Sequence, residues 1–188
     1  MKTTETKFHF VGLGGAGCNI LELFHQKGLK DNYTCITNPK RENLQKDIQF
    51  IHYCSPRDEK TKGILADMTV PLILPKEVKA VFAENCTYVL LAGFGSYTGT
   101  YMTEELAIWL QKNNKHFISI CCMPFFFEGD LHRLHAEKVK NRFQHLPNFI
   151  FYDLEEMREK YGNKTFSEGF EVANNEIYKL FKNKKNEN

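Results

Sequence analysis

The stretch "LLAGFGSYTGTYMTEELA", residues Leu90–Ala107, sets a glycine-rich loop between an apolar run and a helical pattern. Its glycines are interleaved with small hydroxyl side chains. Glycine lets the backbone approach an anion closely, and the first N–H groups of the following helix point at that anion. The stretch therefore predicts a phosphate-binding loop that opens a helix.

A second stretch of the same kind lies upstream, "VGLGGAGCNI", residues Val11–Ile20. Taken alone, this loop also fits a dinucleotide-dependent oxidoreductase. That enzyme class needs an acidic residue at the end of the next strand to hold a ribose, and the chain has "ITNPK" there, residues 36–40. Two phosphate-type loops are more specific than one, so we disfavour the oxidoreductase.

Strand-like runs alternate with helical patterns along the chain. We expect strands at 7–13, 32–38, 48–53, 87–94, 116–123 and 148–152, and helices at 17–28, 75–85, 102–114, 131–146 and 166–181. This alternation predicts an α/β fold, a doubly wound, mostly parallel six-stranded sheet that binds its ligand at the carboxyl ends of the strands. We expect one domain over residues 1–182 and a polar, disordered tail over 183–188.

Bulk properties narrow the function classes. The 188 residues carry a net charge of only +2, which argues against a nucleic-acid partner. No apolar run reaches the roughly 18 residues of a membrane span, and the N-terminus lacks a secretory signal, so we expect a cytoplasmic protein without a transmembrane segment. His132 and His135 are three residues apart, but no further ligands cluster with them, and no metal site is expected.

Taken together, the two loops resemble those of the FtsZ/tubulin superfamily of GTPases. The segment "MPFFFEGDLHR", residues 123–133, resembles the family's Pro-Phe-x-Phe-Glu-Gly segment, and "TFSEGFEVANNEI", residues 165–177, resembles the start of its central helix. The order of elements agrees from about Lys7 to Phe181. The resemblance implies a Rossmann-like nucleotide-binding domain and a place in cell division.

The resemblance also implies a ligand, GTP or GDP, with Mg²⁺ as a candidate companion ion. Glu128 falls where the family holds a ribose hydroxyl, His132 replaces a family Arg and has Arg133 beside it, and Phe166 falls where a side chain stacks on the base. The full set of expected nucleotide-binding residues is Gly14, Gly15, Ala16, Gly17, Cys18, Asn19, Gly95, Ser96, Thr98, Gly99, Thr100, Glu128, His132, Arg133 and Phe166.

Several positions depart from the family pattern. Tyr152 and Phe170 fall where the family reads guanine with an Asn and an Asp, so guanine selectivity is in doubt unless the register shifts by one and Asp153 takes over. The other departures replace family glycines: Ser96, Tyr97 and Tyr101 in the second loop, and Leu65 and Asp67 in "TKGILADMTVP", residues 61–71, the counterpart of the loop that touches the terminal phosphate.

The sequence ends at the central helix, without the acidic catalytic loop and second domain that follow it in the family. We therefore do not expect self-stimulated GTP hydrolysis, and whether the chain is an enzyme stays open. The first hypothesis is a single-domain protein that binds GTP, GDP or a less specific nucleotide. It would act as a switch or as an assembly partner of a full-length FtsZ-like protein or of itself.

The alternative is a degenerate scaffold that binds no nucleotide. In this hypothesis Phe94, Tyr97, Tyr101 and the aromatics of residues 124–129 form a surface for another protein over the former pocket.

Overall fold

A six-stranded sheet in the order β3-β2-β1-β4-β5-β6 forms the centre of the computed structural model, which describes residues 7–29, 31–38, 40–41, 43–53, 74–162 and 166–186. Every neighbouring pair of strands is parallel, so the sheet is fully parallel where the sequence predicted a mostly parallel one. The strands are β1 (Phe8–Leu13), β2 (Asn32–Thr37), β3 (Ile48–His52), β4 (Thr87–Gly93), β5 (Phe117–Met123) and β6 (Phe149–Asp153).

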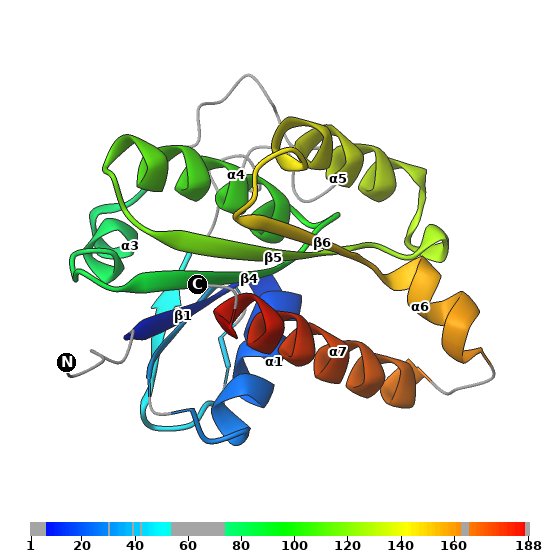
Figure 1. Cartoon of the computed structure of the whole chain (residues 1–188), viewed down its shortest axis with the longest axis horizontal. Helices are drawn as coiled ribbons and strands as arrows, with labels where there is room; N and C mark the ends of the chain where they lie inside the picture. The colour runs from blue at the N-terminus through cyan, green and yellow to red at the C-terminus, as the bar shows by residue number, and fades with distance from the viewer. Residues whose placement is uncertain are drawn as a thin grey trace.

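Helices cover both faces of the sheet (Figure 1). One face carries α3 (Lys76–Val81), α4 (Tyr97–Lys112) and α5 (Asp130–Phe143); the other carries α1 (Gly14–Gln26), α6 (Leu154–Tyr161) and α7 (Phe166–Asn186). A short 3-10 turn, η1 (Phe126–Glu128), precedes α5. Because both faces are covered, β1 and β5 are buried along their whole length, as is usual for parallel strands.

An aromatic cluster fixes α1 and α7 to the sheet. Phe10 of β1 lies 5.5 Å from Phe24 of α1 and 5.2 Å from Phe181 of α7 between ring centroids, both edge to face. Tyr33 of β2 stacks on the same Phe10 ring at 5.4 Å. These contacts hold α1 and α7, which both contribute to the lining of the cavity described below.

Three of the differences between the expected and the observed elements have a clear physical cause. α4 begins at Tyr97, five residues earlier than expected, because the Ser96 side chain caps it. α6 was not predicted; it is short and mostly polar, which leaves little apolar periodicity to recognise.

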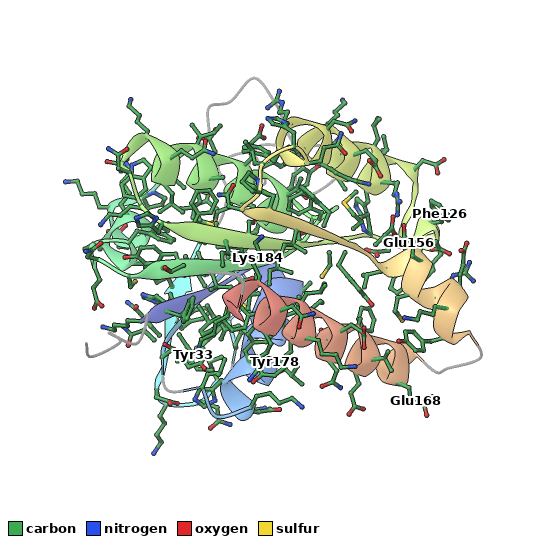
Figure 2. All side chains as sticks on the ribbon, in the orientation of Figure 1. Tyr33, Phe126, Glu156, Glu168, Tyr178 and Lys184 are labelled. Atoms are coloured by element: carbon green, nitrogen blue, oxygen red, sulfur yellow. The ribbon has the colours of Figure 1, made fainter. Side chains whose placement is uncertain are left out.

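The third difference is at the end of the chain, where α7 continues through Asn186 and takes in four residues of the expected tail. Lysines favour the last turn of a helix, and the Lys185 ammonium lies 5.2 Å from the centroid of the Phe8 ring. Figure 2 labels Glu168 and Lys184 near the two ends of this helix.

Candidate functional site

A cavity of about 670 Å³ opens at the carboxyl ends of β1, β4 and β5. The chain leaves β1 toward α1 on one face and β4 toward α4 on the other, so the cavity lies at the point where the strand order reverses. Its lining residues are Gly15, Ala16, Asn19, Ile20, Gly93, Phe94, Gly95, Ser96, Tyr97, Cys122, Pro124, Phe125, Phe127, Glu128, His132, Leu154, Phe170, Ala173, Asn174 and Ile177. Both glycine loops therefore contribute to one site.

The first turn of α1 faces this cavity with its backbone donors uncapped. Leu13 is the N-cap residue, no side chain accepts from the first turn, and that turn carries no acidic residue. Gly15 and Ala16 are exposed and line the cavity. The first N–H groups of a helix have no partner inside it, so this end of the cavity is suited to an anion.

The start of α4 differs from that of α1, because side-chain hydroxyl groups of the loop accept hydrogen bonds from the loop's own backbone N–H groups. The Gly99 N–H donates to Ser96 Oγ at 3.3 Å, and the Gly95 N–H donates to Thr100 Oγ1 at 2.8 Å. Gly95 and Ser96 line the cavity. Thr98, Gly99 and Thr100 are buried behind it and do not line it.

Two of the expected phosphate-loop glycines are required for close packing. A Cβ atom at Gly17 would collide with the Leu91 carbonyl oxygen, and one at Gly99 would collide with the Gly93 carbonyl oxygen. Both helices thus begin directly against β4. Gly14, with φ +72°, makes the turn into α1 and does not line the cavity.

Of the two tyrosines that replace family glycines, only Tyr97 lines the cavity. Tyr97 is half-buried, lines the cavity and stacks on Tyr101, with 5.9 Å between ring centroids and 20° between planes. Tyr101 points away from the cavity, and its hydroxyl is 2.7 Å from Nδ1 of His135. Burial lowers the pKa of His135 from its usual value, helped by Lys138 and His132 nearby.

The segment after β5 places two of its three expected ligand residues at the cavity. Glu128 and His132 line it, although Glu128 Oε1 also accepts from the Phe125 N–H at 2.8 Å. Arg133 does not line the cavity; it donates to the Pro124 carbonyl at 2.7 Å and to Asp153.

The cavity also has an aromatic wall, which comes from α7 and the segment after β5. Phe125 stacks on Phe127, with centroids 4.8 Å apart, and meets Phe170 edge to face at 5.9 Å. Asn174, one turn after Phe170, lines the cavity too. It was not predicted as a site residue, although its spacing of four from Phe170 puts both on one helix face.

The residues at the expected base-binding positions differ in whether they line the cavity. Phe170 lines the cavity, whereas Tyr152 and Asp153 do not. Burial raises the pKa of Tyr152 to about 12. Phe166 is the first residue of α7, and its side chain lies outside the described residues, as do Leu65 and Asp67.

Cys18 and Asn19, the last two expected residues of the first loop, have separate environments. Cys18 is buried, and its thiol is 3.5 Å from the Gly12 carbonyl oxygen. A hydrogen bond from the Cys35 thiol lowers the pKa of Cys18 despite the opposing effect of burial, and the charge of Arg41 adds to that lowering. Asn19 is exposed and lines the cavity, and its side-chain oxygen accepts from Arg41, a residue that the sequence analysis did not single out.

No helix in the described part of the chain is long and apolar enough to cross a membrane. Likewise, the described residues contain no group of three or more His, Cys, Asp or Glu side chains that could hold a metal ion.

Comparisons with known proteins place this geometry in a wider context. No family model matches the chain. The cell division protein FtsZ of Mycoplasmopsis pulmonis is 26% identical over 173 residues, which cover 87% of this chain and 43% of that protein. The chain thus spans less than half the length of this curated relative.

Among solved structures, a single-site variant of FtsZ from M. jannaschii has a TM-score of 0.70 at 19% identity, covering 96% of this chain and 56% of that one. CetZ1 from Haloferax volcanii, solved as a GDP-bound monomer, has a TM-score of 0.63 at 17% identity, covering 91% and 57%. With its six parallel strands and flanking helices, the chain has the α/β fold of the FtsZ/tubulin GTPase domain.

Proposed function

We propose that the chain binds a nucleotide, GTP or GDP, in the cavity between α1, α4 and α7. The observation that carries this proposal is the uncapped start of α1, where Gly15 and Ala16 present backbone donors to the cavity. A phosphate group supplies the negative charge and the acceptor oxygens that such a helix start lacks. The Ser96 hydroxyl, at the start of α4, and His132 of α5 are further polar side chains that line the cavity.

The aromatic wall of the cavity suits a flat ring. Phe125, Phe127 and Phe170 give it aromatic walls, and Asn174 adds an amide that can both donate and accept. Stacking of a base on an aromatic side chain is worth about 1–3 kcal/mol. The cavity volume of about 670 Å³ falls within the range of small-molecule sites.

Among the lining residues, Glu128 is the single carboxylate, and it already accepts from a backbone N–H. In our proposal base selectivity therefore depends on the amides of Asn19 and Asn174. Phosphate contacts at α1 give affinity without regard to the base.

In the cell, we propose that the nucleotide state controls association with an FtsZ-like protein or with a second copy of this chain, in the cytoplasm. Support comes from the relative that is named a cell division protein and from the GDP-bound structure of similar fold. Hydrolysis is not part of the proposal.

The decisive experiment is direct. First, purified protein is denatured and the supernatant is chromatographed for released nucleotide. Second, the refolded or nucleotide-stripped protein is titrated with GTP, GDP and ATP by calorimetry, with and without Mg²⁺. We expect GDP or GTP to bind with a Kd well below 1 mM, the level at about −4.1 kcal/mol. Absence of both released and titratable nucleotide would refute the proposal.

A second candidate, the protein-binding scaffold without nucleotide, has one observation in its favour. Phe126 and Phe127 are 60% and 59% exposed, and Leu131 and Leu134 of α5 are also exposed. Figure 2 shows Phe126 at the edge of the molecule beside α6. Phe94 and Tyr101, expected in the same surface, are buried and take no part in it. This candidate gains support only if the titrations above detect no nucleotide.

A further inference from the structure

Arg41, which follows β2, is anchored to the outer side of α1. Its Nη2 atom donates to the side-chain oxygen of Asn19, and its Nη1 atom lies 3.1 Å from a carboxylate oxygen of Glu22, three residues further along the helix. The Arg41 and Glu22 side chains are 22% and 31% exposed, so this arrangement is partly shielded from water. Arg41 itself does not line the cavity.

This contact decides which way the Asn19 amide points. A guanidinium group carries donors only, so the atom of Asn19 that faces Arg41 is the carbonyl oxygen. The amide NH₂ is left for the cavity, which Asn19 lines. The backbone of Gly15 and Ala16 also offers N–H groups on this wall, so α1 presents donors to a ligand from its first turn through Asn19.

Asn19 lies in the second turn of α1, beyond the uncapped N–H groups at the start of that helix. Its neighbour Ile20 packs in the same apolar cluster as Ala173 and Ile177 of α7, and all three line the cavity. Asn19, Phe170 and Asn174 line that cavity as well.

We propose that Arg41 is a positioning residue that holds the Asn19 NH₂ toward the cavity and so selects a purine with a keto group over one with an amino group. The inference rests on the proposed nucleotide function. Guanine and hypoxanthine carry an acceptor oxygen at C6, whereas adenine carries an NH₂ there. The Asn19 NH₂ and the adenine NH₂ would face each other as two donors, and neither would have an acceptor. A polar group that the ligand buries without a partner lowers affinity by about tenfold or more.

The test measures dissociation constants for GDP, IDP and ADP with the full chain and three variants. Arg41→Met keeps a long side chain but removes every donor. Arg41→Lys keeps a donor-only group that can reach the Asn19 oxygen. Glu22→Gln weakens the other anchor of Arg41 without touching Asn19, and it controls for a general loosening of α1.

We expect the unsubstituted chain to bind GDP and IDP about tenfold or more tighter than ADP. In Arg41→Met that ratio falls to within about threefold, because the amide is then free to turn over. Arg41→Lys and Glu22→Gln retain most of the ratio. The Asn19 side-chain NH₂ signal in a ¹⁵N-correlated NMR spectrum, assigned with Asn19→Ser, shifts on GDP addition in the unsubstituted chain and less in Arg41→Met.

The outcomes separate the two proposals. If the unsubstituted chain binds none of the three nucleotides, the proposed function fails, and this inference fails with it. If nucleotides bind but ADP binds as tightly as GDP, or Arg41→Met keeps the full ratio while its melting temperature changes, the proposed function stands and Arg41 has only a structural role.

Discussion

The guanidinium of Arg133 binds Asp153 through two nitrogens, which donate to the two carboxylate oxygens at 3.1 and 2.5 Å. The same carboxylate accepts from the Glu155 N–H at 3.0 Å and so caps α6. This pair joins α5 to the junction of β6 and α6. Neither Arg133 nor Asp153 lines the cavity, and each neutralises the charge of the other. The structure therefore gives no support to guanine recognition by Asp153.

Replacing Asp153 with Asn should lower stability in a pH-dependent way. Burial of the Asp153 carboxyl acts to raise its pKa, but the bonds from Arg133 and the Glu155 N–H outweigh it, and the pKa lies below its usual value. The pair therefore stabilises the fold above the unfolded-state pKa of about 4 and loses this effect as pH falls through the folded pKa. We expect Asp153→Asn, which keeps the cap, to cost about 2 kcal/mol at pH 7 and much less at pH 3 in urea unfolding. An equal cost at both pH values would contradict this.

Substitution by alanine at two glycines of the first loop should have opposite effects on the free energy of unfolding. A Cβ atom at Gly17 would collide with the Leu91 carbonyl oxygen, whereas the Cβ position of Gly15 is open within 4 Å. We expect Gly17→Ala to lower the free energy of unfolding by about 2 kcal/mol or more. Gly15→Ala should raise it by up to about 1 kcal/mol, because alanine is the better helix former. Thermal and urea unfolding of both variants measure this contrast, and similar values for the two would show that α1 does not begin against β4.

A carboxylate at position 15 should block the proposed phosphate end without unfolding the chain. Gly15 lines the cavity, has open space for a side chain and lies in the first turn of α1, where an acidic residue is favourable. A like charge at about 4 Å opposes a phosphate by up to about 4 kcal/mol, so Gly15→Asp should weaken GDP binding by about 100-fold or more. Gly15→Ala is the matched control and should bind normally. If calorimetry gives the same GDP affinity for Gly15→Asp as for the unsubstituted chain, the nucleotide phosphates do not bind at the start of α1.

Two phenylalanines of comparable exposure should differ in their effect on binding. Phe170 lines the cavity and is 46% exposed, whereas Phe126 is 60% exposed and lies outside the cavity lining. We expect Phe170→Ala to weaken nucleotide binding by about tenfold through loss of stacking, and Phe126→Ala to leave it within about twofold. Fluorescent-nucleotide titrations of the two variants make the comparison. An equal loss of nucleotide binding in both variants would contradict a specific stacking role for Phe170.

The sequence predicted the sheet and both glycine loops because these depend on local patterns. Short apolar runs of strand length and glycines at the strand-to-helix junctions are visible without any tertiary contact. Gly15, Ala16, Gly95 and Ser96 of these two loops line the cavity, and their binding of phosphate stays a prediction. The fold class follows from the same alternation of elements.

The hydrogen-bond and ion-pair partners of the polar groups at the site could not be predicted from the sequence. Gly95 and Gly99 look like phosphate donors, but Thr100 and Ser96 accept from them within the loop itself. Arg133 was expected at the ligand, yet a carboxylate twenty residues away binds it. Arg41 meets Asn19 only after β2 is paired with β1 in the folded sheet. The Ser96 cap is a local contact, but the partners of Arg133 and Arg41 are set by the folded sheet, and no local spacing encodes them.

A buried imidazole on β1 gives the last prediction. His9 Nε2 donates to Thr34 Oγ1 at 2.9 Å, since the Thr34 hydroxyl itself donates to Gln49 at 3.2 Å. Nδ1 is buried with no hydrogen-bond partner among the described residues. Burial lowers the pKa of His9 to about 4, while Glu84 acts to raise it and Lys7 to lower it. The folded protein therefore holds this ring neutral.

Because the unfolded chain binds a proton at His9 below about pH 6.5 and the folded chain does so only near pH 4, stability should fall as pH drops through that window. The contribution is about 3 kcal/mol over the whole range. His9→Gln places an amide donor where Nε2 stands and cannot titrate, so it should keep the Thr34 bond and lose this dependence. Urea unfolding from pH 4 to 7 measures the difference between the two proteins. That difference should favour the unsubstituted chain most at pH 7 and decline toward pH 4; a constant difference would mean that His9 titrates normally in the fold.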